Sequence, residues 1–156
     1  MFKKILLDQE NNKYYVTDTA KDFHTKYGYL TAADLQSSKS MITSNTGHHF
    51  RAFSPTFSDL FDKIKRGPQI ITRKDIGLII AKTGINKNSV VLDAGTGSGA
   101  LACFLASIAK KAISYEREER WIAIAEQNKQ FLGLKNLTIK HHDMYQWIQE
   151  KNIDVI

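Results

Sequence analysis

The sequence has almost none of the features that mark exported or membrane proteins. A single cysteine, Cys103, occurs among 156 residues, so no disulfide can form within the chain. No apolar run approaches the roughly 20 residues that a membrane-spanning helix needs. The apolar stretch within residues 1–8 is also too short for a signal peptide. We therefore expect a cytoplasmic protein that does not bind to a membrane.

The sequence also lacks internal repeats, low-complexity segments and long runs of one charge. A hydrophobic content of 42% and a charged content of 24% are typical of a globular protein, and the length suits one domain or a small domain with part of another. The net charge of +6 permits a polyanionic partner such as RNA. Because the basic residues are scattered, with only pairs such as Lys65-Arg66 and Lys110-Lys111, a solvated basic surface explains the charge equally well.

Residues 1–66 have the pattern of a small β-rich domain with a helix at its end. Four strand-like runs are predicted, from Lys3 to Leu7, Lys13 to Thr17, Met41 to Ser44 and His48 to Phe53. The last two would form a hairpin across Asn45-Thr46-Gly47. Ser54-Pro55-Thr56 would then open a helix that runs through Ile64, because apolar residues recur at helical spacing.

Residues 67–156 alternate between strand-like and helix-like segments. The predicted strands run from Ser89 to Leu92, Ala112 to Tyr115, Thr138 to His141 and Ile153 to Ile156. The predicted helices run from Asp75 to Thr83, Leu101 to Ala109, Glu118 to Leu132 and Met144 to Gln149. The first of them is expected to end at Gly84 and the third at Gly133. This alternation predicts an α/β fold with a Rossmann-like, doubly wound parallel sheet. Because the sequence ends inside the fourth strand, we expect a truncated chain that holds only the N-terminal half of this domain.

A glycine-rich turn after the first of these parallel strands carries the clearest chemical signal. The segment reads Val90-Val91-Leu92-Asp93-Ala94-Gly95-Thr96-Gly97-Ser98-Gly99-Ala100-Leu101. Glycine permits unusual backbone angles and lets a ligand approach the main chain closely. The N-terminus of the helix that follows suits an anionic group. In doubly wound sheets the ligand lies at the switch point between the first and fourth strands, so this turn is the predicted binding site.

The glycine pattern alone fits both nicotinamide dinucleotides and S-adenosylmethionine. It matches G-x-G-x-x-A, and Glu116, about 20 residues further on, is placed to bind the ribose hydroxyls of either cofactor. Gly99 in the turn, and two carboxylates near it, favour S-adenosylmethionine. Asp93 would repel a pyrophosphate. Asp143, at the end of the third strand, would accept a hydrogen bond from the adenine amino group, and it suits capping of the next helix equally well.

Several segments resemble the motifs of class I methyltransferases. Motifs I, II and III are matched by Asp93 to Leu101, Ser114-Tyr115-Glu116 and His142-Asp143-Met144. The lead-in Arg66-Gly67-Pro68-Gln69-Ile70-Ile71, followed by Lys74-Asp75, is similar to that of the tRNA (adenine-N1)-methyltransferases that modify the T-loop. Short blocks of the N-terminal domain are similar to the same family, at residues 23–28, 34–35, 46–50 and 55–56.

The resemblance implies an enzyme that binds S-adenosylmethionine, methylates N1 of a T-loop adenine of tRNA (the position-58 type) and assembles as a homotetramer. By their places in the motifs, the cofactor-binding residues would be Gly95, Thr96, Gly97, Ser98, Gly99, Ala100, Glu116, Trp121, Asp143, Met144, Gln69 and Ile71. Glu116 would bind the ribose, and Asp143 and Met144 would flank the adenine. For Trp121, packing of its helix into the core beside Ala125 is the favoured alternative.

The sequence departs from the family at two places. Thr72-Arg73 stands where relatives often have an aromatic residue followed by proline, so stacking of this loop on the target base is not expected. The acidic residue that positions the target adenine would lie beyond Ile156. The catalytic residue therefore stays unidentified, and we expect this chain alone to be inactive.

Other functions fit the same residues. Motif I does not identify the acceptor, so a class I methyltransferase for a small molecule or a protein is one alternative. An NAD-linked oxidoreductase and a non-catalytic RNA-binding partner subunit are two more, although the intact glycine turn counts against the last. No metal site is expected, because His48-His49 and His141-His142 are adjacent pairs that do not converge on one ion.

Overall fold

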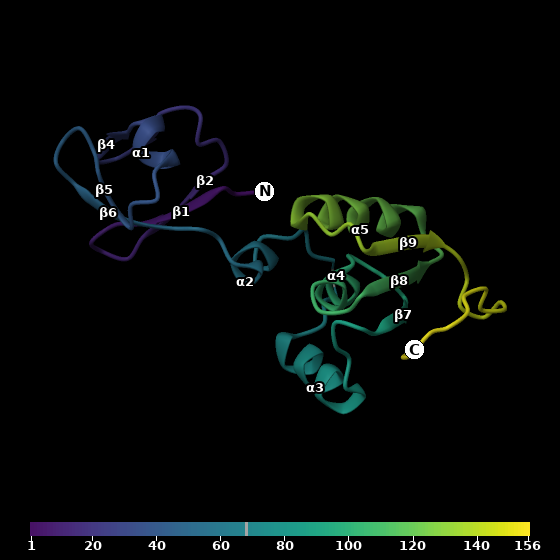
Figure 1. The fold of residues 1–156 in the computed structure, drawn as a ribbon. Helices are drawn as coiled ribbons and strands as arrows, with labels where there is room; N and C mark the ends of the chain where they lie inside the picture. The colour runs from purple at the N-terminus through teal and green to yellow at the C-terminus, as the bar shows by residue number, and fades with distance from the viewer. Residues whose placement is uncertain (68) are drawn as a thin grey trace. The chain divides into compact units, whose positions relative to one another are not determined.

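The computed structural model describes residues 1–67 and 69–156, which form two compact units, Met1–Leu60 and Phe61–Ile156 (Figure 1). Pro68, part of the lead-in that resembles the tRNA methyltransferases, lies outside the described residues. In the described part of the chain we find no helix with the length and apolar character to cross a membrane.

The first unit is built on an antiparallel sheet. Its elements are β1 (Lys4–Leu7), β2 (Lys13–Val16), β3 (Phe23–Thr25), β4 (Gly28–Leu30), α1 (Ala32–Gln36), β5 (Met41–Thr43) and β6 (His49–Phe53). Four strands form a sheet in the order β2-β1-β6-β5, and β3 and β4 form a separate hairpin. The four predicted strands and the predicted hairpin between β5 and β6 are confirmed. The sequence analysis missed β3, β4 and α1.

One face of the antiparallel sheet is the core of this unit. Along β6, buried and exposed residues alternate, so Phe50 and Ala52 point inward while Arg51 points outward. The buried cluster consists of Leu6, Val16, Leu30, Leu35, Ile42, Phe50 and Ala52. The alternation along β6 therefore determines which face of this strand is buried.

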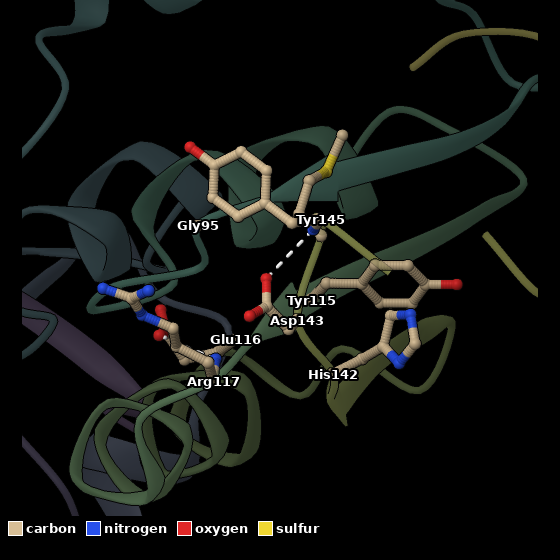
Figure 2. A pocket seen from close by; sticks show the side chains of 8 residues that line it. Gly95, Tyr115, Glu116, Arg117, His142, Asp143 and Tyr145 are labelled. Atoms are coloured by element: carbon tan, nitrogen blue, oxygen red, sulfur yellow. Dashed lines mark hydrogen bonds between the residues drawn. The ribbon is translucent and has the colours of Figure 1, made fainter. Parts of the chain in front are cut away.

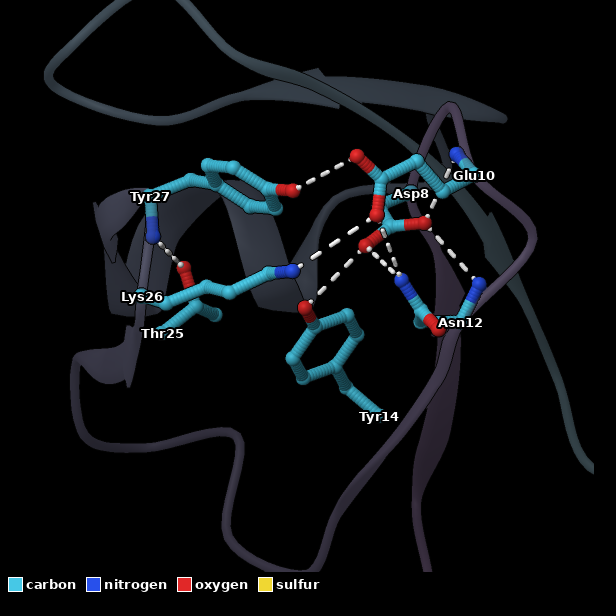
Figure 3. A network of polar contacts seen from close by, with 7 residues as sticks. All are labelled: Asp8, Glu10, Asn12, Tyr14, Thr25, Lys26 and Tyr27. Atoms are coloured by element: carbon cyan, nitrogen blue, oxygen red, sulfur yellow. Dashed lines mark hydrogen bonds and ion pairs between the residues drawn. The ribbon is translucent and has the colours of Figure 1, made fainter.

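A polar network closes the turn between β1 and β2 (Figure 3). The Asp8 carboxylate, almost fully buried, accepts hydrogen bonds from the backbone of Glu10 and Asn12, from the Asn12 amide and from the Tyr14 hydroxyl, at 2.9 to 3.1 Å. Burial by itself would raise the pKa of Asp8, but the hydrogen bonds from Asn12, Tyr14 and Glu10 together lower it. Lys26 lies 3.6 Å from Glu10, which ties the β3–β4 hairpin to this turn.

The helix predicted to run through Ile64 is shorter than expected. Helix α2 covers only Phe57–Phe61. Ile64 donates its backbone N–H to Phe61, three residues back, and Lys65 donates its own to the side chain of Asn128. The prediction was wrong here because a tertiary hydrogen bond takes the donor that a longer helix would have used.

The second unit contains a parallel sheet covered by helices. Its elements are α3 (Arg73–Thr83), β7 (Val90–Ala94), α4 (Ala100–Ala106), β8 (Lys111–Glu116), α5 (Glu119–Leu132) and β9 (Leu137–His141). The strands lie side by side in the order β7-β8-β9, all parallel. The predicted parallel α/β sheet is confirmed. Thr72 caps the start of α3, and α3 and α5 end at the two predicted glycines, Gly84 and Gly133.

The predicted fourth strand is present only as one isolated bridge. Val155 pairs with Val91 in parallel, with hydrogen bonds of 2.9 Å from Leu92 N to Val155 O and from Asp154 N to Val90 O. These bonds use the edge of β7 that faces away from β8. The sheet order therefore reverses at β7, which makes the carboxyl end of β7 the switch point where such sheets bind ligands.

The helix predicted from Met144 to Gln149 does not form. Asp143 closes a turn instead, because its carboxylate accepts from Tyr145 N at 2.9 Å and its carbonyl accepts from Gln146 N at 2.9 Å. His142 Nε2 lies 3.2 Å from the Trp147 carbonyl, which is therefore not used in a helix. Tyr145 and Trp147 are 94% and 88% exposed, so they add no packing that would stabilise a helix, while Ile148 packs against the core cluster of Leu92, Ile113 and Tyr115.

Candidate functional site

The turn between β7 and α4 contains three glycines with positive φ. The φ angles are 81° at Gly95, 52° at Gly97 and 81° at Gly99, a region that other residues rarely adopt. Apart from its own chain neighbours, no described residue has an atom within 4 Å of a Cβ built on Gly95, and at Gly97 the nearest such atom is 3.9 Å away. A Cβ on Gly99 would lie 2.9 Å from the Cβ of Ala125 on α5. Gly95 and Gly97 therefore leave the loop open to a ligand, whereas Gly99 allows α4 and α5 to pack.

Glu116, at the end of β8, is held against this loop. Its Oε2 accepts the backbone N–H of Gly97 at 2.9 Å, and its Oε1 accepts those of Arg117 at 2.9 Å and Glu118 at 3.1 Å. The residue is 8% exposed. Because each carboxylate oxygen can accept two hydrogen bonds, Glu116 keeps acceptor capacity for a ligand hydroxyl while it fixes the loop.

Asp93 is tied to the neighbouring strand and, through it, to the loop. Ser114 Oγ donates to Asp93 Oδ2 at 2.6 Å, and Thr96 Oγ1 lies 2.6 Å from Ser114 Oγ. Since Ser114 gives its only hydroxyl proton to Asp93, Thr96 must donate to Ser114. The Asp93 carboxylate thus supports the loop through Ser114 and Thr96, a role that the sequence did not predict.

Burial raises the pKa of Asp93, while hydrogen bonds from Ser114 and from the backbone of Ala94 oppose the shift. A carboxyl whose pKa is higher in the folded state stabilises the fold below its ordinary pKa of 3.8, and this contribution is lost as the pH rises through the folded pKa. We expect the stability of the Asp93→Asn variant, relative to the wild type, to increase as the pH rises from about 3.8. Urea unfolding at several pH values measures this, and a difference independent of pH would contradict it.

A first cavity of about 230 Å³ opens on one side of the loop (Figure 2). It is lined by Gly95, Tyr115, Glu116, Arg117, His142, Asp143, Met144 and Tyr145. Figure 2 shows Asp143 in the middle of this group, with Glu116 and Arg117 on one side and Tyr115 and His142 on the other. The His142 ring packs edge-on against Tyr115, with centroids 4.6 Å apart. The cavity thus combines acidic groups with flat apolar surface, as a nucleoside requires.

A second cavity of about 320 Å³ lies on the other side of the loop and is lined by Gly67, Gln69, Gly95, Gly97, Ser98 and Trp121. Gly95 lines both cavities, so the two are neighbours. The half-buried Trp121 ring packs on Gly67, where an added Cβ would lie 3.1 Å from the ring atom Cζ3. Trp121 therefore faces this cavity as well as its own helix.

The structure brings most of the predicted cofactor residues together. Eight of them line one of the two cavities: Gly95, Gly97, Ser98, Glu116, Trp121, Asp143, Met144 and Gln69. Four line neither cavity: Thr96, Gly99, Ala100 and Ile71. Thr96 and Ala100 are buried beneath the loop, at 6% and 4% exposed, so their contribution is to its shape.

Asn128 was missed by the sequence analysis. It lies on α5, is 2% exposed, and makes three hydrogen bonds of 2.8 Å to the backbone of Lys65 and Ser98. Its spacing from Ala125 and Leu132, both buried, was the available signal, because it puts an amide on the buried face of a helix.

Neither a metal site nor a reactive thiol is found among the described residues. Among residues 1–67 and 69–156, no group of three or more His, Cys, Asp or Glu side chains could hold a metal ion. Burial raises the pKa of Cys103 to about 12, so its thiol stays protonated at neutral pH and is a poor nucleophile.

Comparison with known proteins agrees with this geometry. Residues 85–156 match the family model of a methyltransferase domain. The chain is 29% identical to the tRNA (adenine(57)-N(1)/adenine(58)-N(1))-methyltransferase TrmI of Methanocaldococcus jannaschii, over 98% of this chain and 64% of the relative. The chain thus spans less than two thirds of the length of this relative.

Two solved structures are similar in fold. A S-adenosylmethionine-dependent O-methyltransferase from Thermotoga maritima has a TM-score of 0.79 and 25% identity, over 99% of this chain and 61% of that one. The tRNA (m1A58) methyltransferase TrmI of Aquifex aeolicus has a TM-score of 0.72 and 25% identity, over 94% and 59%. The Rossmann-like fold class is confirmed. Residues 85–156 therefore match a methyltransferase domain, and nearly the whole chain is similar to TrmI proteins.

Proposed function

We propose that the protein binds S-adenosylmethionine and methylates N1 of a T-loop adenine in tRNA. One observation carries this proposal: two neighbouring cavities share Gly95, one beside Glu116 and Asp143 and the other beside Gly97 and Trp121. This arrangement suits a ligand with a nucleoside at one end and an amino-acid group at the other. The tRNA substrate is proposed because TrmI proteins are similar to nearly the whole chain.

The residues of the site fit the cofactor. The open space beside Gly95 and Gly97 lets a ligand approach the backbone of the loop, and the backbone around Gly97 and Ser98 would hold the amino-acid part. Glu116 would accept hydrogen bonds from the ribose hydroxyls. Asp143 would bind the adenine amino group through the oxygen that does not accept from Tyr145, and Met144 would pack on the adenine ring.

When bound, S-adenosylmethionine supplies an activated methyl group, so the protein chiefly has to align the acceptor and exclude water. N1 lies on the Watson–Crick edge of adenine, and the target base must therefore be unpaired and turned into the site. Gln69 and Trp121 form the cavity wall on the side where the base would enter. The positive net charge supports contacts with the RNA backbone.

Cofactor binding is the first test. We expect titration calorimetry to give saturable binding of S-adenosylmethionine and none of NAD, with binding lost in Gly97→Arg, because the arginine would fill the open space beside the loop. Gly47→Arg is the matched control, since Gly47 also has positive φ and open space but lies in the first unit. Binding of NAD in place of S-adenosylmethionine would contradict the proposal.

The acceptor requires a separate measurement. Incubation of a longer form of the protein, which extends beyond Ile156, with S-adenosylmethionine and unmodified tRNA, followed by mass spectrometry of the nucleosides, should give 1-methyladenosine that is absent when the target adenine is replaced by guanine. Methylation of a protein or a small molecule but not of tRNA would favour the first alternative. Tight tRNA binding without cofactor binding would favour a non-catalytic partner subunit. Light scattering would test the tetramer that the family resemblance implies.

A further inference from the structure

Asn128 joins two segments that are far apart in the sequence. Its Oδ1 accepts from Lys65 N, while its Nδ2 donates to the carbonyls of Lys65 and Ser98, each at 2.8 Å. The side chain therefore uses one acceptor and both donors on backbone groups. At 2% exposed, it is shielded from water, which makes these bonds costly to lose.

Both segments contribute to the second cavity. Ser98 belongs to the glycine-rich loop and lines the cavity directly. Lys65 comes just before Gly67 and Gln69, which line the same cavity. In the described part of the chain, no backbone-to-backbone hydrogen bond joins these two segments, so the Asn128 amide is their polar link.

We propose that Asn128 is a positioning residue that couples the glycine-rich loop to the wall formed by Gly67 and Gln69. The inference rests on the proposed function, in which the loop holds the methyl donor and the wall borders the acceptor. A ligand that orders the loop also orders the wall through the shared amide. By linkage, an ordered wall favours ligand binding at the loop to the same extent.

Amide hydrogen exchange tests this coupling without any measurement of activity. In the wild type, S-adenosylmethionine should slow exchange at Gly97 and Gly99 and also at Lys65 and Gly67. In Asn128→Asp, the carboxylate still accepts from Lys65 N but cannot donate to either carbonyl. We expect S-adenosylmethionine to slow exchange at the loop of this variant as it does in the wild type. At Lys65 and Gly67, the slowing by the ligand should be about tenfold smaller than in the wild type.

The neighbouring residue Gln127 supplies the matched control. Its side chain accepts from Lys65 Nζ at 2.5 Å on the exposed side of α5. Gln127→Ala should retain protection of both segments. Asn128→Ala is a second variant that removes all three hydrogen bonds, for the case in which the introduced charge itself unfolds the unit.

The outcomes are distinct. Equal ligand protection at Lys65 and Gly67 in the wild type and in both Asn128 variants would overturn the inference. An Asn128 that acts only in stability would lower the free energy of unfolding and leave this protection intact, which also overturns it. If the wild type binds no S-adenosylmethionine, the proposed function fails. The coupling is then tested in the free protein, where both variants should speed exchange at Gly97 and Gly99 together with Lys65, and unchanged exchange at Gly97 and Gly99 would overturn it.

Discussion

Replacement of Gly99 by alanine should lower the free energy of unfolding by about 2–4 kcal/mol. Two costs add at this position. The φ of 81° is strained for a residue with a Cβ, and that Cβ would lie 2.9 Å from the Cβ of Ala125 and 3.2 Å from its Cα. The second contact involves backbone, so α4 and α5 would have to separate to accommodate it. Urea unfolding followed by circular dichroism measures the change.

Gly95 supplies a control that separates these two costs. Its φ is also 81°, but no described atom outside its own chain neighbours lies within 4 Å of the added Cβ, so Gly95→Ala should cost only about 1 kcal/mol. Adding Ala125→Gly to Gly99→Ala removes the nearest contact and should recover part of the loss. Equal destabilisation by the two alanines, or no recovery in the double variant, would show that helix packing is not the reason for glycine at position 99.

Replacement of Glu116 by alanine should weaken S-adenosylmethionine binding by about 10- to 100-fold, the effect of losing hydrogen bonds to a charged group. The change removes the proposed ribose acceptor. It also leaves the backbone N–H groups of Gly97, Arg117 and Glu118 without their acceptor, so the loop loses its support at the same time. Titration calorimetry measures the dissociation constant.

The controls for Glu116 use amide and surface variants. Glu116→Gln keeps a carbonyl acceptor and should show an intermediate loss of affinity. Glu119→Ala removes an exposed carboxylate in the first turn of α5 and should leave the dissociation constant unchanged. If Glu116→Ala bound the cofactor as tightly as the wild type, the assignment of Glu116 to the ribose would be wrong.

The second unit was largely predictable because its local signals agree with its tertiary structure. Buried strands alternate with helices, and Gly84 and Gly133 end two helices in the left-handed conformation, as their positions predicted. The glycine turn and Glu116 were also found, because a parallel strand order brings the carboxyl ends of β7 and β8 to one edge of the sheet.

The missed elements of the first unit depend on contacts between distant residues. Strands β3 and β4 have three residues each, too few for a recognisable alternation. Tyr29 in β4 donates its N–H to the Asn45 side chain at 2.8 Å and accepts the Asn45 N–H at 3.0 Å, so a loop 16 residues away holds the hairpin. The sequence of residues 23–30 does not indicate that Asn45 is their hydrogen-bond partner.

By itself, the sequence determined the class of the second unit, the place of its glycine-rich turn and the carboxylate beside it. These follow from periodicity and from glycine positions, which act over a few residues. Only the tertiary structure decided that Asp93 turns to Ser114, that residues 144–149 form no helix, and that Asn128 links Lys65 to Ser98. Each of these features depends on hydrogen bonding or on a lack of packing. Both are set by distances in space, which the order of residues does not give.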